Sequence, residues 1–289
     1  LMKKTPYFKI GKKTFDISKP HIVGVLNVTP DSFSDGGQFL DTDKALSRIE
    51  KLIRDGASII DIGAESTRPG ADKVDDFEQI KRLDPVVKVY KNYFSTPLSI
   101  DTTNSTVFSY CLSNGADMLN DVSGLQDDPK MIDIVSEAAC SVVMMHRLGI
   151  SKTMQDRPHY KNVIEEIASF FSDTVENLKN RGVSSILLDP GIGFGKSLNH
   201  NLEILRHLDE LCIDDYPLFI GTSRKSFIGT ITGASSDERV AGTIASSLHA
   251  FQKGARFFRV HDVRELKQAF DIHEAIITGE VNKVEKGED

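Results

Sequence analysis

Short apolar segments recur eight times along the chain and alternate with longer segments of helical periodicity. We interpret the apolar segments as strands at 21–27, 57–62, 97–101, 116–120, 141–146, 184–189, 217–221 and 255–260. Ranges 41–56 and 160–182 are typical of the intervening helices. Because apolar strands that alternate with helices form helix-covered parallel sheets, the pattern predicts an α/β fold, a (β/α)8 TIM barrel. A doubly wound sheet is the alternative, although it more often has about six strands.

Glycine marks the ends of several predicted helices. Gly56, Gly115, Gly182 and Gly254 each stand just before a small or apolar residue that leads into the next strand. Glycine at this place supplies the left-handed turn that ends a helix. No Pro- or Ser-rich linker divides the chain, so we expect one domain over 1–289. It consists of a hairpin in 1–20, a barrel over about 21–275 and a flexible tail at 280–289.

Charge and hydropathy exclude several classes of partner. The 289 residues include 35 Lys and Arg against 42 Asp and Glu, a net charge of −7, which disfavours nucleic-acid binding. No apolar run approaches the length of a membrane span, and we expect a cytoplasmic protein without a signal peptide. Three widely spaced cysteines, Cys111, Cys140 and Cys212, predict buried or half-buried thiols, not a disulfide framework or a zinc site.

Polar residues gather at the carboxyl ends of the predicted strands, where barrel active sites lie. They are Asn27, Asp61, Asp101, Asn120, Met145, His146, Asp189, Thr222, Lys225, Arg259 and His261. A carboxylate can accept two parallel hydrogen bonds from an N–C–N edge, so Asp101, Asn120 and Asp189 together suit a donor-rich heterocycle. At any one position the alternative is a cap of the following helix.

A second group of residues suits an anion. Alternation along a strand places Arg259 and His261 on the same side, next to Asn27 of the neighbouring first strand. This corner fits a phosphate or pyrophosphate with Mg²⁺, which takes few protein ligands beside phosphate and water oxygens. The alternative for Arg259 is a salt bridge to Asp262 or Glu265. No HxH or HExxH pattern supports a transition metal held by protein ligands alone.

Three loops have unusual composition. Ranges 27–39 and 63–71 are rich in Gly, Pro, Ser and Thr, and we interpret them as lids that order on binding. The glycines of 191–196 have the wrong spacing for a dinucleotide turn. Lys225 and Ser226 lie at a predicted helix start, which suits a carboxylate. A Schiff-base role for Lys225 is disfavoured, because this lysine lies beyond the strand end.

Eight motifs, in order from about residue 21 to 275, resemble those of bacterial dihydropteroate synthases. They are NVTPDSFSDGG, IDIGAESTRPGA, SIDTTN, NDVSG, MMHRLGISKTMQ, DPGIGFGK, GTSRKSFIG and FRVHDV. The resemblance implies a homodimeric, Mg²⁺-dependent transferase of folate biosynthesis and a sulfonamide target. Such an enzyme joins 6-hydroxymethyl-7,8-dihydropterin pyrophosphate to 4-aminobenzoate, releasing pyrophosphate. Departures are small: Ala64 replaces a usual glycine, and MMHRLG replaces a commoner LMHMQG-like sequence.

The resemblance also implies roles for individual residues. The pterin would contact Asp101, Asn120, Met145, Asp189 and Lys225. The metal would bind Asn27, and the pyrophosphate would bind Arg259, His261, Thr67 and Arg68. The aminobenzoate would lie near Phe194, Lys225 and Ser226, enclosed by Phe33 and Pro69, while Asp35 would support the closed-loop transition state.

No nucleophile–base pair is evident in the sequence, and dissociative, SN1-like substitution needs none, because pyrophosphate is already a good leaving group. Two alternatives stay open. A pterin-binding methyltransferase shares the barrel and pocket by resemblance, but has no use for the two lids or the anion site. A non-catalytic pterin-binding barrel would be expected to have lost a charged residue at the mouth, and none is missing.

Overall fold

A computed structural model describes residues 7–28, 38–65, 73–149, 158–213 and 216–280. The chain begins with the predicted hairpin, in which β1 (Tyr7–Ile10) pairs antiparallel with β2 (Lys13–Asp16). Apart from Glu280, the predicted flexible tail lies outside the described residues. Within the described ranges, every helix is too short or too polar to span a bilayer.

Eight parallel strands form a closed barrel in the order β10-β3-β4-β5-β6-β7-β8-β9. The strands are β3 (His21–Asn27), β4 (Ile59–Gly63), β5 (Leu98–Asp101), β6 (Met118–Asp121), β7 (Ser141–Met145), β8 (Ile186–Asp189), β9 (Leu218–Ile220) and β10 (Ala255–Val260). Closure through the pairing of β10 with β3 confirms the predicted TIM barrel, because a doubly wound sheet stays open.

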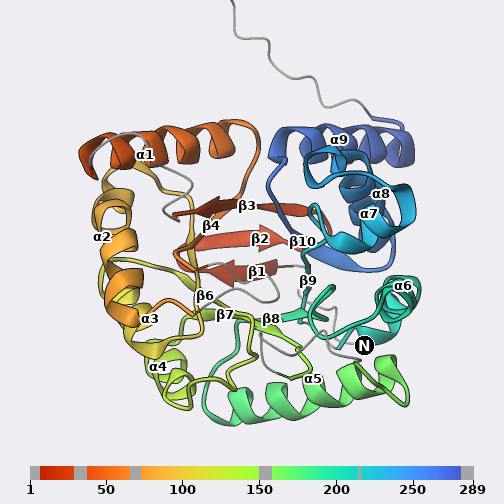
Figure 1. Cartoon of the computed structure of the whole chain (residues 1–289), viewed down its shortest axis with the longest axis horizontal. Coiled ribbons are helices and arrows are strands. Elements are labelled where there is room, and N and C mark those ends of the chain that lie inside the picture. The colour runs from red at the N-terminus through yellow and green to blue at the C-terminus, as the bar shows by residue number, and fades with distance from the viewer. Residues whose placement is uncertain (1–6, 29–37, 66–72, 150–157, 214–215, 281–289) are drawn as a thin grey trace, which may run out of the picture.

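Helices surround the strands (Figure 1). They are α1 (Gln38–Arg54), α2 (Asp76–Tyr93), α3 (Ser105–Ser113), α4 (Met131–Ala138), α5 (Val163–Asn180), α6 (Leu198–Arg206), α7 (Ser226–Thr232), α8 (Val240–Gln252) and α9 (Val263–Thr278), with short 3-10 turns η2 (Leu208–Leu211) and η3 (Ser236–Glu238). The predicted helix-ending glycines have positive φ angles, for example 113° at Gly56 and 102° at Gly254.

Side-chain hydrogen bonds explain where some elements begin later than predicted. Helix α5 begins at Val163 because the Asn162 side chain accepts from the first free backbone N–H groups of the helix. Strand β8 begins at Ile186, and the Ser185 hydroxyl before it donates to the Lys9 carbonyl at 2.5 Å. Among the cysteines, Cys111 and Cys140 are buried as predicted. The prediction is wrong for Cys212, which is exposed beside a short surface turn.

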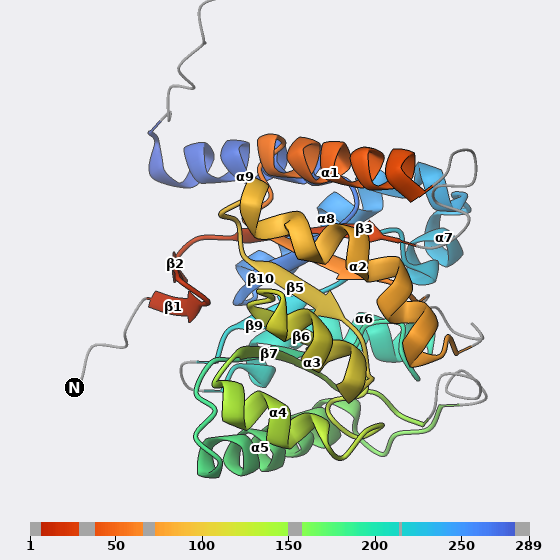
Figure 2. The ribbon, with the colours of Figure 1, turned by 90° about the vertical axis from the view of Figure 1, so that its left-hand side faces the viewer.

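The interior of the barrel is built in layers. One apolar layer comprises Val23, Ile59, Met118, Val143, Leu187, Phe219 and Phe257, and packs against Phe8, Ile10 and Phe15 of the hairpin. The hairpin lies at one end of the barrel, where the strands begin (Figure 2). Because the strands are parallel and all begin at this end, the polar residues at their carboxyl ends lie together at the opposite end, which forms the mouth.

Candidate active site

Side-chain alternation brings the predicted site residues into one layer of the barrel. Asp61, Asn120, Met145, Asp189 and Arg259 each follow a member of the apolar interior layer by two positions. Successive strand residues point to opposite faces, so all five side chains point inward. The helix-cap alternative fails for Asp101 and Asp189, because the following helices α3 and α6 are capped by Asn104 and Ser197. It also fails for Asn120, because the following helix α4 has no side-chain cap hydrogen bond.

Arg259 forms the central ion-pair cluster of this layer. Its Nε donates to Asp61 Oδ2 at 2.6 Å, and its Nη2 donates to Asp101 Oδ2 at 2.8 Å. Asp61 also accepts from Asn120 Nδ2 at 3.0 Å and from Ser99 Oγ at 2.6 Å. The alternative salt bridge to Asp262 or Glu265 is not formed by Arg259, and Asp262 is instead bound by Arg224.

Asp101 has one oxygen left for a ligand. In the described part of the chain, its Oδ1 is buried and has no hydrogen-bond partner. Burial raises the pKa of Asp101, with Arg259 opposing this effect and Asp61 adding to it. A buried polar atom without a partner is costly, so Asp101 Oδ1 is suited to accept a hydrogen bond from a bound molecule.

Asp189 and Lys225 are two further charged residues of the mouth, and each acts on the other through its charge. Burial raises the pKa of Asp189 to about 6, while the backbone N–H of Gly191 at 2.7 Å lowers it. Burial lowers the pKa of Lys225 to about 8 against the attraction of Asp189. The Lys225 Nζ donates to the Ile192 carbonyl at 2.8 Å and lies 3.9 Å from the centroid of the Phe194 ring.

A buried lysine lies beside this pair. Lys196 is 3% exposed, and its Nζ contacts the Phe194 carbonyl, the His146 carbonyl and His146 Nδ1 at 3.0, 3.1 and 3.1 Å. Burial and the Lys196 charge lower the pKa of His146 to about 3, so its imidazole is neutral and Nδ1 accepts. Burial lowers the pKa of Lys196 to about 7.

The anion corner is only partly assembled. Asn27 ends β3 and is half-buried at the mouth, on the strand that pairs with β10. His261 follows β10, and its Nδ1 lies 3.0 Å from Ser223 Oγ, whereas the Arg259 guanidinium faces β4 and β5. Ser226 begins α7 as predicted and is exposed. Five predicted residues lie outside the described ranges: Phe33, Asp35, Thr67, Arg68 and Pro69.

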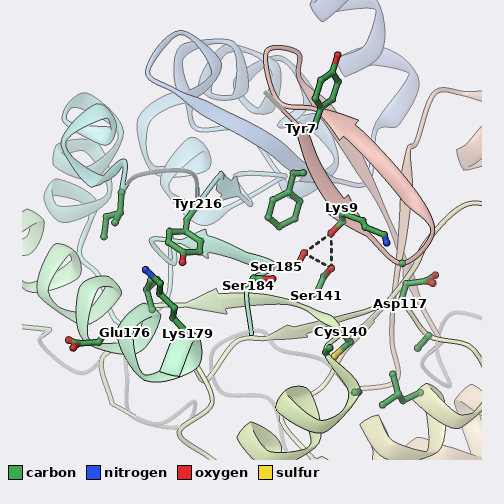
Figure 3. A pocket seen from close by; sticks show the side chains of 18 of the residues that line it. Tyr7, Lys9, Asp117, Cys140, Ser141, Glu176, Lys179, Ser184, Ser185 and Tyr216 are labelled. Atoms are coloured by element: carbon green, nitrogen blue, oxygen red, sulfur yellow. Dashed lines mark hydrogen bonds between the residues drawn. The ribbon is translucent and has the colours of Figure 1, made fainter. Parts of the chain in front are cut away.

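A cavity of about 1020 Å³ opens at the opposite end of the barrel, between the hairpin, α4 and α5 (Figure 3). Its polar groups bind one another. The Ser141 and Ser185 hydroxyls both donate to the Lys9 carbonyl, and Asp117 pairs with Lys91 at 2.5 Å. This end of a TIM barrel serves stability, while chemistry takes place at the mouth, so we assign the site to the mouth.

Two charged residues at or beside the mouth have no role in the prediction from the sequence. Asp61 is a predicted strand-end residue, and the pattern that indicates its inward position is its place two residues after Ile59. Lys196 lies in a glycine-rich loop without periodicity, so nothing in the sequence showed that it is buried.

The buried polar residues lie at the carboxyl end of a (β/α)8 barrel, where the active sites of barrel enzymes lie. The family model described as pterin binding enzyme matches residues 23–261. The fold and site are therefore those of a pterin-binding barrel. A dihydropteroate synthase of Haemophilus influenzae is 41% identical over 267 residues, which cover 92% of this chain and 97% of the relative. The chain belongs to the dihydropteroate synthase family of pterin-binding enzymes.

Solved structures agree with this assignment. A Xanthomonas albilineans dihydropteroate synthase with 4-aminobenzoic acid has a TM-score of 0.88 and 37% identity, covering 95% of this chain and 99% of that one. A structure of the synthase from the same organism, in complex with 7,8-dihydropteroate, has a TM-score of 0.84 and 34% identity, covering 94% and 99%.

Proposed function

We propose that this transferase condenses 6-hydroxymethyl-7,8-dihydropterin pyrophosphate with 4-aminobenzoate, giving 7,8-dihydropteroate and pyrophosphate. The observation that carries the proposal is the buried, unpartnered Asp101 Oδ1 in a mouth that also contains Asn120 and Asp189. A pterin has several N–H donors and acceptors on a flat ring, which such a set of carboxylates and an amide complements. Related synthases have been solved with 4-aminobenzoic acid and with 7,8-dihydropteroate.

The pterin would lie across the mouth between Asp101 and Asp189. Their carboxylates would accept from the ring donors, Asn120 would add an amide, and buried Met145 would pack against one ring face. Lys225 would contact the pterin and help to hold the aminobenzoate near Phe194 and Ser226. Asp101 would accept a ring N–H at its unpartnered Oδ1, while Arg259 holds Oδ2 of the same carboxylate at 2.8 Å.

The pyrophosphate would lie near Asn27, Arg259 and His261, with Thr67 and Arg68 from the second lid. The donor fits Mg²⁺, because Asn27 offers one hard amide oxygen and Mg²⁺ takes its other ligands from phosphate and water oxygens. Bound Mg²⁺ would supply charge neutralisation at the pyrophosphate oxygens. Arg259 and His261 would stabilise the same developing charge.

The reaction would proceed by dissociative, SN1-like substitution at carbon. The C–O bond to pyrophosphate breaks first, and the electron-rich pterin stabilises the resulting cation. The aniline nitrogen of aminobenzoate then forms the C–N bond and loses a proton. The protein would orient the nitrogen and exclude water, with Phe33, Asp35 and Pro69 as predicted lid residues.

We also propose a homodimer, as the family resemblance implies. Ile272, Ile276 and Ile277 of α9 are 64–74% exposed, and apolar side chains gathered in this way are typical of protein interfaces. Light scattering after size-exclusion chromatography tests this state directly. A cytoplasmic location and the single-domain organisation stay predictions from the sequence.

The decisive experiment mixes the purified chain with both substrates and Mg²⁺, and follows pyrophosphate release together with dihydropteroate formation. Equal amounts of both products are expected. Pterin binding without turnover would favour the non-catalytic barrel. Binding of a methylated pterin in preference to the pyrophosphate ester would favour the methyltransferase.

A further inference from the structure

We propose that Lys196 is a positioning residue that sets the place of Lys225 by fixing the loop between β8 and α6. The inference rests on the proposed function, because it concerns the lysine expected to contact the pterin. Lys196 is 3% exposed, and its Nζ contacts groups of His146 and Phe194 rather than a side chain expected to hold the pterin. These contacts link Lys196 to Lys225 through the loop, in addition to the direct effect of its charge on Asp189 and Lys225.

The three contacts of Lys196 Nζ match the capacity of an ammonium group. An ammonium has three N–H donors and no acceptor, and Nζ has three acceptors at 3.0–3.1 Å: two carbonyls, of His146 and Phe194, and the neutral His146 imidazole. Two of these acceptors belong to the residue after β7, and the third belongs to the loop after β8. Lys196 thus ties the loop to the neighbouring strand.

The same loop holds Lys225. The Ile192 carbonyl accepts from Lys225 Nζ at 2.8 Å, and the Phe194 ring lies under that nitrogen with its centroid at 3.9 Å. The buried Lys196 ammonium therefore fixes the backbone of Phe194, and the Phe194 ring and the Ile192 carbonyl place the Lys225 ammonium. Removing the Lys196 ammonium should let the Lys225 ammonium move.

The loop is also packed so closely that it has little freedom when Lys196 is in place. A Cβ added at Gly191 would lie 2.0 Å from the His146 carbonyl oxygen, and one at Gly195 would lie 2.5 Å from the Leu148 carbonyl oxygen. The Tyr160 hydroxyl donates to the Gly195 carbonyl at 2.9 Å. Burying a charge is costly, so an apolar side chain would suffice if the loop needed only filling.

The test is a double-mutant cycle with pteroic acid as the probe, its affinity measured by titration calorimetry. Lys196→Met keeps the aliphatic stem and removes the three donors. We expect it to weaken binding by about tenfold in the wild-type background and by less than about twofold in a Lys225→Met background. Lys179→Met, at an exposed lysine of α5, is the matched control and should leave affinity unchanged.

Equal losses in both backgrounds, or no loss in either, would overturn the role of Lys196, since a general structural effect does not depend on Lys225. If Lys196→Met does not fold, Tyr160→Phe loosens the loop from its other side. Tyr160→Phe should weaken pteroic acid binding about threefold when Lys225 is present and less in the Lys225→Met background. Equal losses of affinity in the two backgrounds would likewise overturn the inference. A folded wild-type chain that binds no pteroic acid would instead refute the proposed function.

Discussion

Arg259 Nε lies 2.6 Å from Asp61 Oδ2, and this contact holds the guanidinium deep in the barrel. The other end of the guanidinium binds Asp101 at 2.8 Å, so one cation serves two buried carboxylates. Asp61 is itself saturated by Asn120 and Ser99, whereas Asp101 keeps one unpartnered oxygen in the described structure. Asp61 therefore anchors Arg259, and Asp101 is the carboxylate with an oxygen free to bind a pterin.

Arg259→Ala should reduce kcat/KM at least about tenfold, since a charge-assisted contact to phosphate contributes about 1.5–3 kcal/mol. The loss should include kcat, because the charge on the departing pyrophosphate grows in the transition state. It should also destabilise the fold by about 3–5 kcal/mol, because Asp61 and Asp101 lose a buried partner. Steady-state kinetics and thermal midpoints on the same preparation measure both.

Arg259→Lys should recover only part of the loss, because lysine keeps the charge without the planar fork that reaches both carboxylates. Arg264→Ala, at an exposed arginine on α9, is the control and should change neither quantity. Full turnover of Arg259→Ala with only a lowered midpoint would show that Arg259 is structural.

Asp189→Asn should weaken pterin binding by about 1–3 kcal/mol, because the amide offers an NH₂ where the ring needs an acceptor. The same variant should be more stable than the wild type at pH 8. Burial raises the Asp189 pKa from 3.8 to about 6, a penalty of about 3 kcal/mol on the ionised form. Calorimetric titration and chemical denaturation test the two effects, and near-wild-type affinity would refute the pocket assignment.

Pterin affinity should fall as the pH drops below about 6, where the Asp189 carboxylate takes up a proton. The pH dependence of folding stability due to Asp189 has the opposite sign to that of pterin affinity. Between the unfolded pKa of 3.8 and the folded pKa of about 6 the native state holds more protons, so this group lowers stability as pH rises through that window. Binding and unfolding measured from pH 4.5 to 8 check both directions. In Asp189→Asn the pH dependence due to Asp189 should disappear from each.

Substrates should bind in order, with the pterin pyrophosphate before aminobenzoate. The predicted lids at 27–39 and 63–71 and the pyrophosphate would together complete the second site, so aminobenzoate alone should bind weakly. Adding pyrophosphate and Mg²⁺ should tighten it. Calorimetry with aminobenzoate in the presence and absence of these additions gives the comparison. Tight binding to the ligand-free chain would contradict the order.

The barrel and most of its mouth can be predicted from local sequence patterns. Eight apolar segments, helix-ending glycines such as Gly56 and polar strand ends such as Asp101 are local features, and period-two alternation carries them directly into the interior. The hairpin and the placement of Ser226 at a helix start followed from equally local signals.

The pairing of charged residues, in contrast, depends on how the barrel closes. Arg259 is 198 residues from Asp61 along the chain, and local periodicity says nothing about which of several inward carboxylates a guanidinium reaches. Lys196 is similar: its Nζ donates to the carbonyl of His146, 50 residues earlier. Charge pairing and burial are set by distances between strands that only barrel closure brings together, so these contacts could not be predicted from the sequence.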